Sequence, residues 1–236
     1  MTDFEMKLSN DINIETVLKS IIKETSKWEF KTADYIKLVN ALLDLSLDKR
    51  PASTSDKLIM NNPNPGRLDL PLTGDQIQIR IFNRETDYKI IQKWLEDEFG
   101  CLFLLSRLDT KNNSLEQLIE DDRNILGLIT LPDSTPIGLM GFLDYDNIHH
   151  KAEMRKLIGE EEYRERGYAK EATMLWIQYG INNLELKKIY LYTIENNIRN
   201  VSLNKELGFM AEGILRKECL IGDKYSDLLR MGLIVD

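Results

Sequence analysis

The chain has 236 residues, of which 42% are hydrophobic and 30% charged, and these proportions exclude a disordered or fibrous protein. Its formal net charge of −8 disfavours binding to nucleic acid or to anionic lipid. The polar amino terminus has no apolar core of a signal peptide, and no apolar run is long enough to span a membrane, so we expect a cytoplasmic protein without a membrane partner.

Two amphipathic helices are predicted before residue 50. Apolar residues recur at helical spacing in 14–30 and again in 32–47. The composition then changes to a stretch rich in proline and asparagine without periodicity, which predicts a linker or an extended wrap. We therefore divide the chain into a helical segment of unknown role (1–49), a linker (50–75) and a larger domain (76–236).

The larger domain has the pattern of an α/β protein. Alternating or continuous apolar runs predict strands, and apolar residues at helical spacing predict helices between them. The predicted strands are 76–82, 124–131, 137–145, 152–158, 187–194, 209–221 and 225–235, and the predicted helices are 85–99, 114–122, 168–183 and 198–208.

The cysteines and histidines do not form a recognisable metal site. Cys101 and Cys219 make no ligand spacing with each other, and a reducing compartment argues against a disulfide. His149 and His150 are adjacent, and no acidic or thiol partner follows at ligand spacing. We expect two unpaired thiols, two surface histidines and no bound metal.

A stretch suited to binding phosphate precedes the helix 168–183. It reads Arg164-Glu165-Arg166-Gly167-Tyr168-Ala169. The first turn of a helix offers unpaired backbone N–H groups and the positive end of the dipole, which favour a pyrophosphate. Gly167 and Ala169 let phosphates approach the backbone closely, while Arg164 and Arg166 add positive charge. Taken alone, this spacing also occurs as an ordinary turn and cap.

A second stretch extends the pattern. Asn197 opens a helix that ends in Leu207-Gly208-Phe209, and Glu212-Gly213-Ile214-Leu215-Arg216 follows. Together the two stretches resemble the GNAT superfamily of acetyltransferases, and in particular its Rim-type branch. The family's signature for acetyl-CoA, Arg/Gln-x-x-Gly-x-Gly/Ala, matches Arg164, Gly167 and Ala169. The resemblance covers residue 76 to the end, and implies an α/β GNAT fold with a mixed, splayed central sheet flanked by helices.

The resemblance also implies where acetyl-CoA binds. The strands 153–158 and 188–194 are expected to separate, and the pantetheine arm lies in the gap, paired with exposed backbone like an added strand. Leu157 and Ile158 would supply that backbone, and Asn197 would reach the arm from the other side. The residues expected to bind the co-substrate are Leu157, Ile158, Arg164, Arg166, Gly167, Tyr168, Ala169, Asn197, Asn200 and Asn204.

The reaction needs a neutral amine, a stabilised oxyanion and a leaving thiolate. Glu153 stands where many relatives hold a carboxylate that acts through water, so we expect it to be the general base, with an ordinary strand glutamate as the alternative. The Ile158 N–H would stabilise the oxyanion. Many relatives protonate the thiolate with a tyrosine at the position of Asn204, whose amide is no proton source at neutral pH. Ser202, Tyr192 and Tyr225 are other candidates for that proton.

The expected activity is transfer of acetyl from acetyl-CoA to a primary amine of a small molecule or peptide, by direct attack in a ternary complex. No cysteine or serine is placed with a histidine as a nucleophile pair. Acidic residues at 96–98 and 120–122 would suit a polyamine or aminoglycoside, although a solvated helix face is the simpler explanation. The alternatives are a nucleotide-linked amino-sugar N-acetyltransferase and a catalytically weak acyl-CoA-binding regulatory module. A homodimer is left open.

Overall fold

The computed structural model describes residues 16–30, 34–35, 37–39, 41–42, 67–96, 114–194, 197–221 and 223–235. The chain divides into two compact units, Met1–Lys49 and Arg50–Asp236. In the first unit, residues 16–25 are α-helical and continue into the short 3-10 helix η1 (Ser26–Trp28), and the described part of 34–42 is also helical. Among the described residues, no helix is long and apolar enough to cross a membrane.

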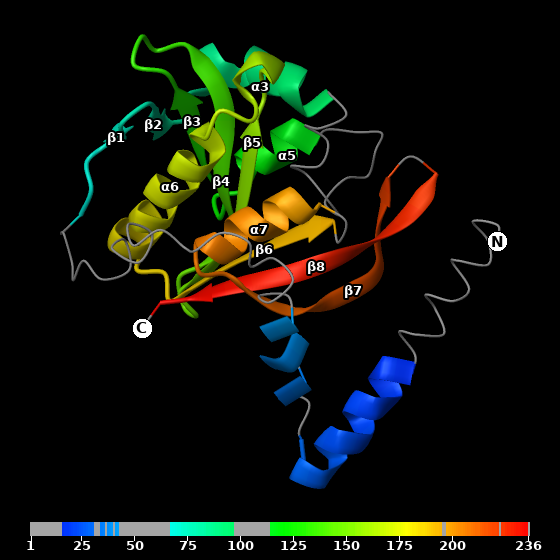
Figure 1. Cartoon of the computed structure of the whole chain (residues 1–236). Coiled ribbons are helices and arrows are strands. Elements are labelled where there is room, and N and C mark those ends of the chain that lie inside the picture. The colour runs from blue at the N-terminus through cyan, green and yellow to red at the C-terminus, as the bar shows by residue number, and fades with distance from the viewer. Residues whose placement is uncertain are drawn as a thin grey trace. The chain divides into compact units, whose positions relative to one another are not determined.

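The second unit is built on one sheet of eight strands (Figure 1). Its spatial order is β1-β2-β3-β4-β5-β6-β8-β7. The strands are β1 (Leu72–Thr73), β2 (Gln78–Ile81), β3 (Ile125–Thr130), β4 (Pro136–Asp146), β5 (Lys151–Ile158), β6 (Lys188–Ile194), β7 (Met210–Ile221) and β8 (Lys224–Ile234). The helices are α3 (Arg84–Glu96), α5 (Ser114–Glu120), α6 (Tyr168–Leu184) and α7 (Ile198–Glu206), with a 3-10 turn η2 (Glu161–Tyr163).

The pairing of β5 with β6 shapes the site. It is the parallel pair of this sheet, and its ladder contains only Lys151 with Lys188, Ala152 with Ile189 and Glu153 with Tyr190. Beyond Glu153, β5 remains paired with β4, and β6 remains paired with β8 along its whole length. The two halves of the sheet therefore separate after Glu153, which confirms the splayed sheet expected from the sequence.

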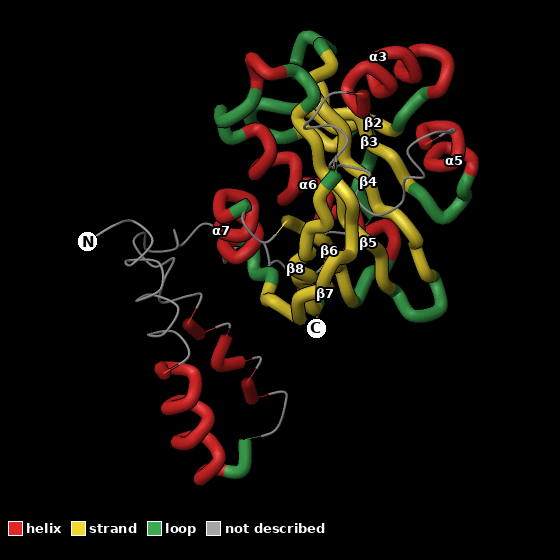
Figure 2. Tube along the Cα trace, turned by 90° about the vertical axis from the view of Figure 1, so that its right-hand side faces the viewer, coloured by secondary structure: helices red, strands yellow, loops and turns green. Residues whose placement is uncertain are grey.

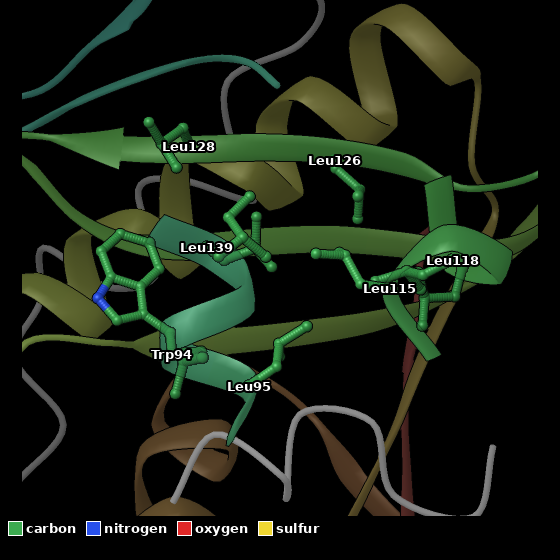
Figure 3. Close-up of a cluster of buried hydrophobic side chains, with 10 residues drawn as sticks. Trp94, Leu95, Leu115, Leu118, Leu126, Leu128 and Leu139 are labelled. Atoms are coloured by element: carbon green, nitrogen blue, oxygen red, sulfur yellow. The ribbon is translucent and has the colours of Figure 1, made fainter. Parts of the chain in front are cut away.

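Helices cover both faces of the sheet (Figure 2). On one face, Trp94 and Leu95 of α3 and Leu115 and Leu118 of α5 pack on leucines of β3, β4 and β5 (Figure 3). On the other face, Trp176 of α6 stacks on Phe142 of β4 at a centroid distance of 5.3 Å. Alternate residues of one strand thus enter two different layers, and successive side chains of β5 face different surroundings.

The chain before β2 is packed on α6. The Leu68 N–H donates to Oδ1 of Asn183 at 3.0 Å, and Nδ2 of Asn183 donates to the Leu68 carbonyl at 2.9 Å. Leu72 is buried, and β1 pairs with β2. The predicted linker extends to residue 75, whereas the structure incorporates residues 67–75 into the second unit. The remaining predicted strands and helices of this unit appear within a few residues of their expected bounds, apart from residues 97–99, which lie outside the described residues.

Candidate functional site

A cavity of about 340 Å³ lies where β5 and β6 separate. Residues 154–158 of β5 line one side, and residues 191–194 of β6 line the other. Ala169 at the start of α6 and residues 197–203 around the start of α7 complete the wall. The cavity therefore connects the predicted phosphate-binding stretch with the gap between the strands.

The start of α6 has the backbone conformation needed to hold an anion. Gly167 is the residue before the helix and has φ of 90°, a left-handed value that strongly favours glycine. A Cβ built on Gly167 meets nothing within 4 Å, so the space in front of it is open. No side chain caps this helix end. Open space before helix N–H groups fits a pyrophosphate.

The two arginines of this stretch have different surroundings. The Arg164 guanidinium donates from Nε to the Ile158 carbonyl at 3.1 Å and from Nη2 to the Gly159 carbonyl at 2.9 Å. Arg164 therefore ties the end of β5 to the loop before α6. Arg166 is exposed, and its guanidinium lies 5.8 Å from the centre of the Tyr163 ring. Arg164 lines the cavity, whereas Arg166 does not line it but has an exposed guanidinium that can reach phosphate oxygens.

The backbone N–H and C=O groups of Leu157 and Ile158 point to opposite edges of β5. The Gly159 N–H donates to Ile137 of β4, so the groups of Leu157 also face β4 and those of Ile158 face the gap. The bond from Arg164 to the Ile158 carbonyl agrees with this direction. The alternation assigns the backbone that faces the gap to Lys156 and Ile158, and corrects the expectation that Leu157 supplies it.

Asn197 and Asn200 hold the start of α7 against β6. Oδ1 of Asn197 caps the helix by accepting from the Asn200 N–H at 3.2 Å. Nδ2 of Asn200 donates to Oγ1 of Thr193 at 3.0 Å. Both asparagines line the cavity. The Asn200 amide is therefore engaged in positioning α7, while Asn197 is exposed beside the cavity.

Asn204 pairs with a residue that the sequence analysis did not select. Its side chain is fully buried, and its Oδ1 accepts from Nζ of Lys156 at 2.6 Å. Nδ2 of Asn204 is buried without a hydrogen-bond partner among the described residues. A buried N–H without a partner costs roughly 1–3 kcal/mol. Desolvation lowers the pKa of Lys156 to about 7.

The signal for Lys156 was present in the sequence. In the strand Ala152–Ile158 it alternates with Met154 and Ile158, so a lysine occupies an otherwise apolar face. Sequence alone does not show that this face meets α7 beside a cavity.

Glu153 lies at the last paired position before the strands separate. Its carboxylate forms an ion pair with the Arg155 guanidinium, and both residues are almost completely buried, at 2% and 4% exposed. The Arg155 guanidinium also lies 5.8 Å from the centre of the Tyr192 ring. Glu153 is thus placed at the inner end of the gap, but as a partner of an arginine that the sequence analysis did not consider.

A polar cluster on β6, β7 and β8 surrounds Tyr192, which the sequence named as a candidate, with Tyr190, Arg230 and Lys188, which it did not. The Arg230 guanidinium lies 4.4 Å from the centre of the Tyr190 ring, donates to the Tyr192 hydroxyl at 3.1 Å and donates to the Glu212 carboxylate at 3.1 Å. Lys188 also pairs with Glu212. Burial raises the pKa of Tyr190 to about 12, and it also raises the pKa of Tyr192. These hydroxyls are weaker acids than ordinary tyrosines.

The remaining candidates lie away from the cavity. Nδ1 of His149 is 2.8 Å from the Asp146 carboxylate in an exposed turn. Tyr225 is 65% exposed. Cys219 is a buried free thiol, while Cys101 lies outside the described residues, as do Asp97 and Glu98 of the predicted acidic cluster.

Comparison with known proteins shows what this arrangement is similar to. The family model described as acetyltransferase (GNAT) domain matches residues 77–210. The spermidine N(1)-acetyltransferase of Escherichia coli (strain K12) is 26% identical over 151 residues, which are 64% of this chain and 77% of that protein. The spermidine N(1)-acetyltransferase of Vibrio cholerae is 28% identical over 159 residues, which are 65% of this chain and 85% of that protein.

A solved structure gives the same result for the fold. The crystal structure of spermidine N-acetyltransferase from Vibrio cholerae in complex with CoA and spermine superposes with a TM-score of 0.59 at 25% identity. The match covers 69% of this chain and 97% of that one. The first 76 residues of the chain precede the region matched by the family model.

Proposed function

Because the chain belongs to the GNAT family of acetyltransferases and is an acetyl-CoA-dependent N-acetyltransferase, we propose that its acceptor is a primary amine of a polyamine such as spermidine. The pattern from Asn197 to Arg216 supports a finer placement in the Rim-type branch. The observation that carries the proposed activity is the cavity that opens between β5 and β6 and ends at the start of α6.

We propose that acetyl-CoA binds along this cavity. Its pyrophosphate would meet the N–H groups at the start of α6, where Gly167 leaves open space. Its pantetheine amides would pair with the backbone of Lys156, which faces the gap as that of Ile158 does. Behind the cavity-lining Lys156, the buried Asn204 accepts from its ammonium and keeps an Nδ2 donor without a partner among the described residues. These features support the site from three separate elements of the fold.

The acceptor amine must lose a proton before it attacks the thioester. An alkyl ammonium with a pKa near 10.4 is only about one part in a few thousand neutral at pH 7. In our proposal Glu153 accepts that proton through a water molecule, and Arg155 holds its carboxylate in place. The Ile158 N–H stabilises the oxyanion. Attack is direct, in a ternary complex, without an acyl-enzyme.

The choice of a polyamine rests on the relatives and on charge. Both curated relatives described above carry spermidine in their names, and the solved relative was crystallised with spermine. The net charge of −8 favours approach of a polycation. Glu120, Asp121 and Asp122 at the end of α5 add local negative charge, although Arg123 pairs with Asp121.

A panel of amines tests the acceptor. Purified full-length chain would be incubated with acetyl-CoA and spermidine, spermine, an aminoglycoside, a nucleotide-linked amino sugar or a peptide, and thiol release and the acetylated product would be measured. We expect the highest kcat/KM with spermidine or spermine. A higher value for the amino sugar or the peptide would contradict the polyamine proposal, and no turnover with any amine would favour an acyl-CoA-binding module.

A further inference from the structure

We propose that Lys156 is the catalytic acid that protonates the departing CoA thiolate, in the place of the tyrosine that Asn204 replaces. The inference rests on the acetyl-CoA chemistry of the family and on the proposed position of acetyl-CoA between β5 and β6, and it holds for any acceptor amine.

Lys156 lies on the open part of β5. The last residue of β5 that pairs with β6 is Glu153, so Lys156 follows the point of separation by three positions. It lines the cavity together with Met154, Ile158 and Leu203. A pantetheine arm that extends inward from the start of α6 carries its thioester along this side chain. The Lys156 ammonium thus lies on the face of the sheet that is proposed to hold acetyl-CoA. The Glu153 side chain lies on the opposite face, because side chains alternate along a strand.

The other titratable side chains that line the described part of the cavity are poorer proton donors. The guanidiniums of Arg155, Arg164 and Arg199 keep their protons at neutral pH. Glu165 is exposed and forms an ion pair with Arg199, so it is an anion. Burial raises the pKa of Tyr192 above its ordinary value. Of the lining groups, Lys156 is the one whose acidity suits neutral pH.

The chemistry of the Lys156 ammonium suits the step. An ammonium has three N–H groups, and Oδ1 of Asn204 accepts one of them at 2.6 Å, which leaves two for a ligand. Met140 of β4 lies opposite Lys156, and the residues on the same face of β5, Met154 and Ile158, are uncharged. Desolvation among such neighbours lowers the pKa of Lys156 to about 7. A thiol has a pKa of about 8.5, so transfer of the proton from Lys156 to the thiolate is favourable.

The proposed step balances. The neutral acceptor amine, whose ammonium has given one proton to Glu153 through water, forms the new C–N bond, and its nitrogen then releases a second proton to water. The C–S bond breaks, and its electron pair moves to the sulfur of CoA. Lys156 then transfers one proton from Nζ to that sulfur, which yields the free thiol and a neutral lysine. The lysine regains a proton from solvent before the next turnover.

Substitution of Lys156 tests the proposal in the full-length chain. With any amine that wild type acetylates, Lys156→Met should lower kcat by roughly 10²-fold, the usual contribution of a positioned acid. Acetyl-CoA should still raise the Tm of the variant, which shows that it folds and binds the co-substrate. Lys187→Met is the matched control, because Lys187 is exposed in the loop after α6 and does not line the cavity. Its kcat should equal that of wild type.

The pH profile separates an acid from a structural lysine and from a base. Because the acid must be protonated, wild-type kcat should have a descending alkaline limb that begins near pH 7. Lys156→Arg keeps the positive charge but does not titrate, so it should lose this limb and most of kcat even if Lys156→Met fails to fold. An unchanged kcat in either folded variant would overturn the proposal. So would a wild-type kcat that rises with pH through pH 7, if that rise is absent in Lys156→Arg, because a base and not an acid would then be titrating.

A rescue variant completes the test. Lys156→Met combined with Asn204→Tyr returns a hydroxyl acid to the position that relatives use, and it should regain part of the kcat that Lys156→Met loses. If wild type acetylates an amine other than a polyamine, the proposed acceptor is wrong. The role of Lys156 is then tested with the same variants and that amine.

Discussion

The phosphate site at the start of α6 depends on the backbone of Gly167. Its φ of 90° is strained for other residues, and the open space before it is where phosphates would lie. Acetyl-CoA at 100 times its Kd should stabilise wild type by about 2.7 kcal/mol and raise its Tm. Gly167→Glu places a bulky anion in this space, so the rise should disappear.

Gly213 provides a matched control for this substitution. It is exposed on β7, and a Cβ there also meets nothing within 4 Å, but its backbone does not require glycine. Gly213→Glu should keep the full rise in Tm. Equal shifts in the two variants would show that the phosphates bind elsewhere.

Glu153 is proposed as the base, yet it is also half of a buried ion pair. Glu153→Gln should therefore have two effects. It should lower kcat by roughly 10²-fold if the carboxylate accepts the proton. It should also lower stability, by about 3–5 kcal/mol, because the Arg155 charge stays buried without its partner. Acetyl-CoA binding should change little. Turnover and Tm, measured on the same preparation, report the two effects separately.

The double variant Glu153→Gln and Arg155→Gln distinguishes these effects. Removing both charges should restore much of the Tm but not kcat. If kcat recovers together with Tm, Glu153 has a structural role and is not the base.

Lys156 should leave a signature in the stability of the unliganded protein. Its folded pKa of about 7 lies below the value near 10.4 of an unfolded lysine. Between these pH values the unfolded chain binds more protons, so the free energy of unfolding of wild type rises with pH relative to a variant without this group. The difference in stability between wild type and Lys156→Met should therefore shift in favour of wild type from pH 7 to pH 10.

Urea unfolding of the two proteins across this range measures that difference. A difference independent of pH would mean that Lys156 titrates at its ordinary value in the folded protein. The same measurement on Lys187→Met provides the control for removal of an exposed lysine.

At the level of elements, the sequence predicted the strands better than the chain before them. The strands from residue 76 onward have long apolar or alternating runs, and most of these runs are buried on at least one face, whereas β7 buries only Ala211 and Cys219. The strand β1 has two residues in a segment without periodicity, so no pattern marks it. It pairs with β2, and the residues just before it pack on α6. Both of these elements come later in the sequence.

The same limit applied within the site. Gly167, Ala169 and Asn197 could be predicted because local motifs mark them. The pairs of Lys156 with Asn204 and Glu153 with Arg155 could not, because they depend on which face of β5 meets which helix. Alternation assigns residues to two faces but does not say what covers each face.

The wrap of residues 67–76 on α6 predicts where the catalytic unit begins. A fragment from Arg50 keeps the two hydrogen bonds between Leu68 and Asn183, whereas a fragment from Pro71 loses them. At about 0.5–1.5 kcal/mol for each bond, the fragment from Pro71 should be less stable by roughly 1–3 kcal/mol. Chemical denaturation of the two fragments would show this, and equal midpoints would contradict it.

At the scale of the whole molecule, the first unit has no assigned role. Its described residues include exposed Val17, Ile22 and Trp28, at 52%, 55% and 75% exposed. Two short helices bury too little surface to be stable alone, so we propose that they contribute to acceptor binding or dimerisation. The fragment from Arg50 should then bind acetyl-CoA like the full chain but have a higher acceptor KM or a smaller mass in sedimentation. Identical values would leave the segment without a catalytic role and favour partner binding.

In the proposed mechanism, the enzyme holds acetyl-CoA in the gap between β5 and β6 while a polyamine attacks it directly. The most direct test measures initial rates of the full-length chain at crossed concentrations of acetyl-CoA and spermidine. We predict saturation with both substrates and intersecting double-reciprocal lines, as a ternary complex requires. Parallel lines would indicate an acyl-enzyme, and thiol release that does not depend on spermidine would contradict acetyl transfer to a polyamine.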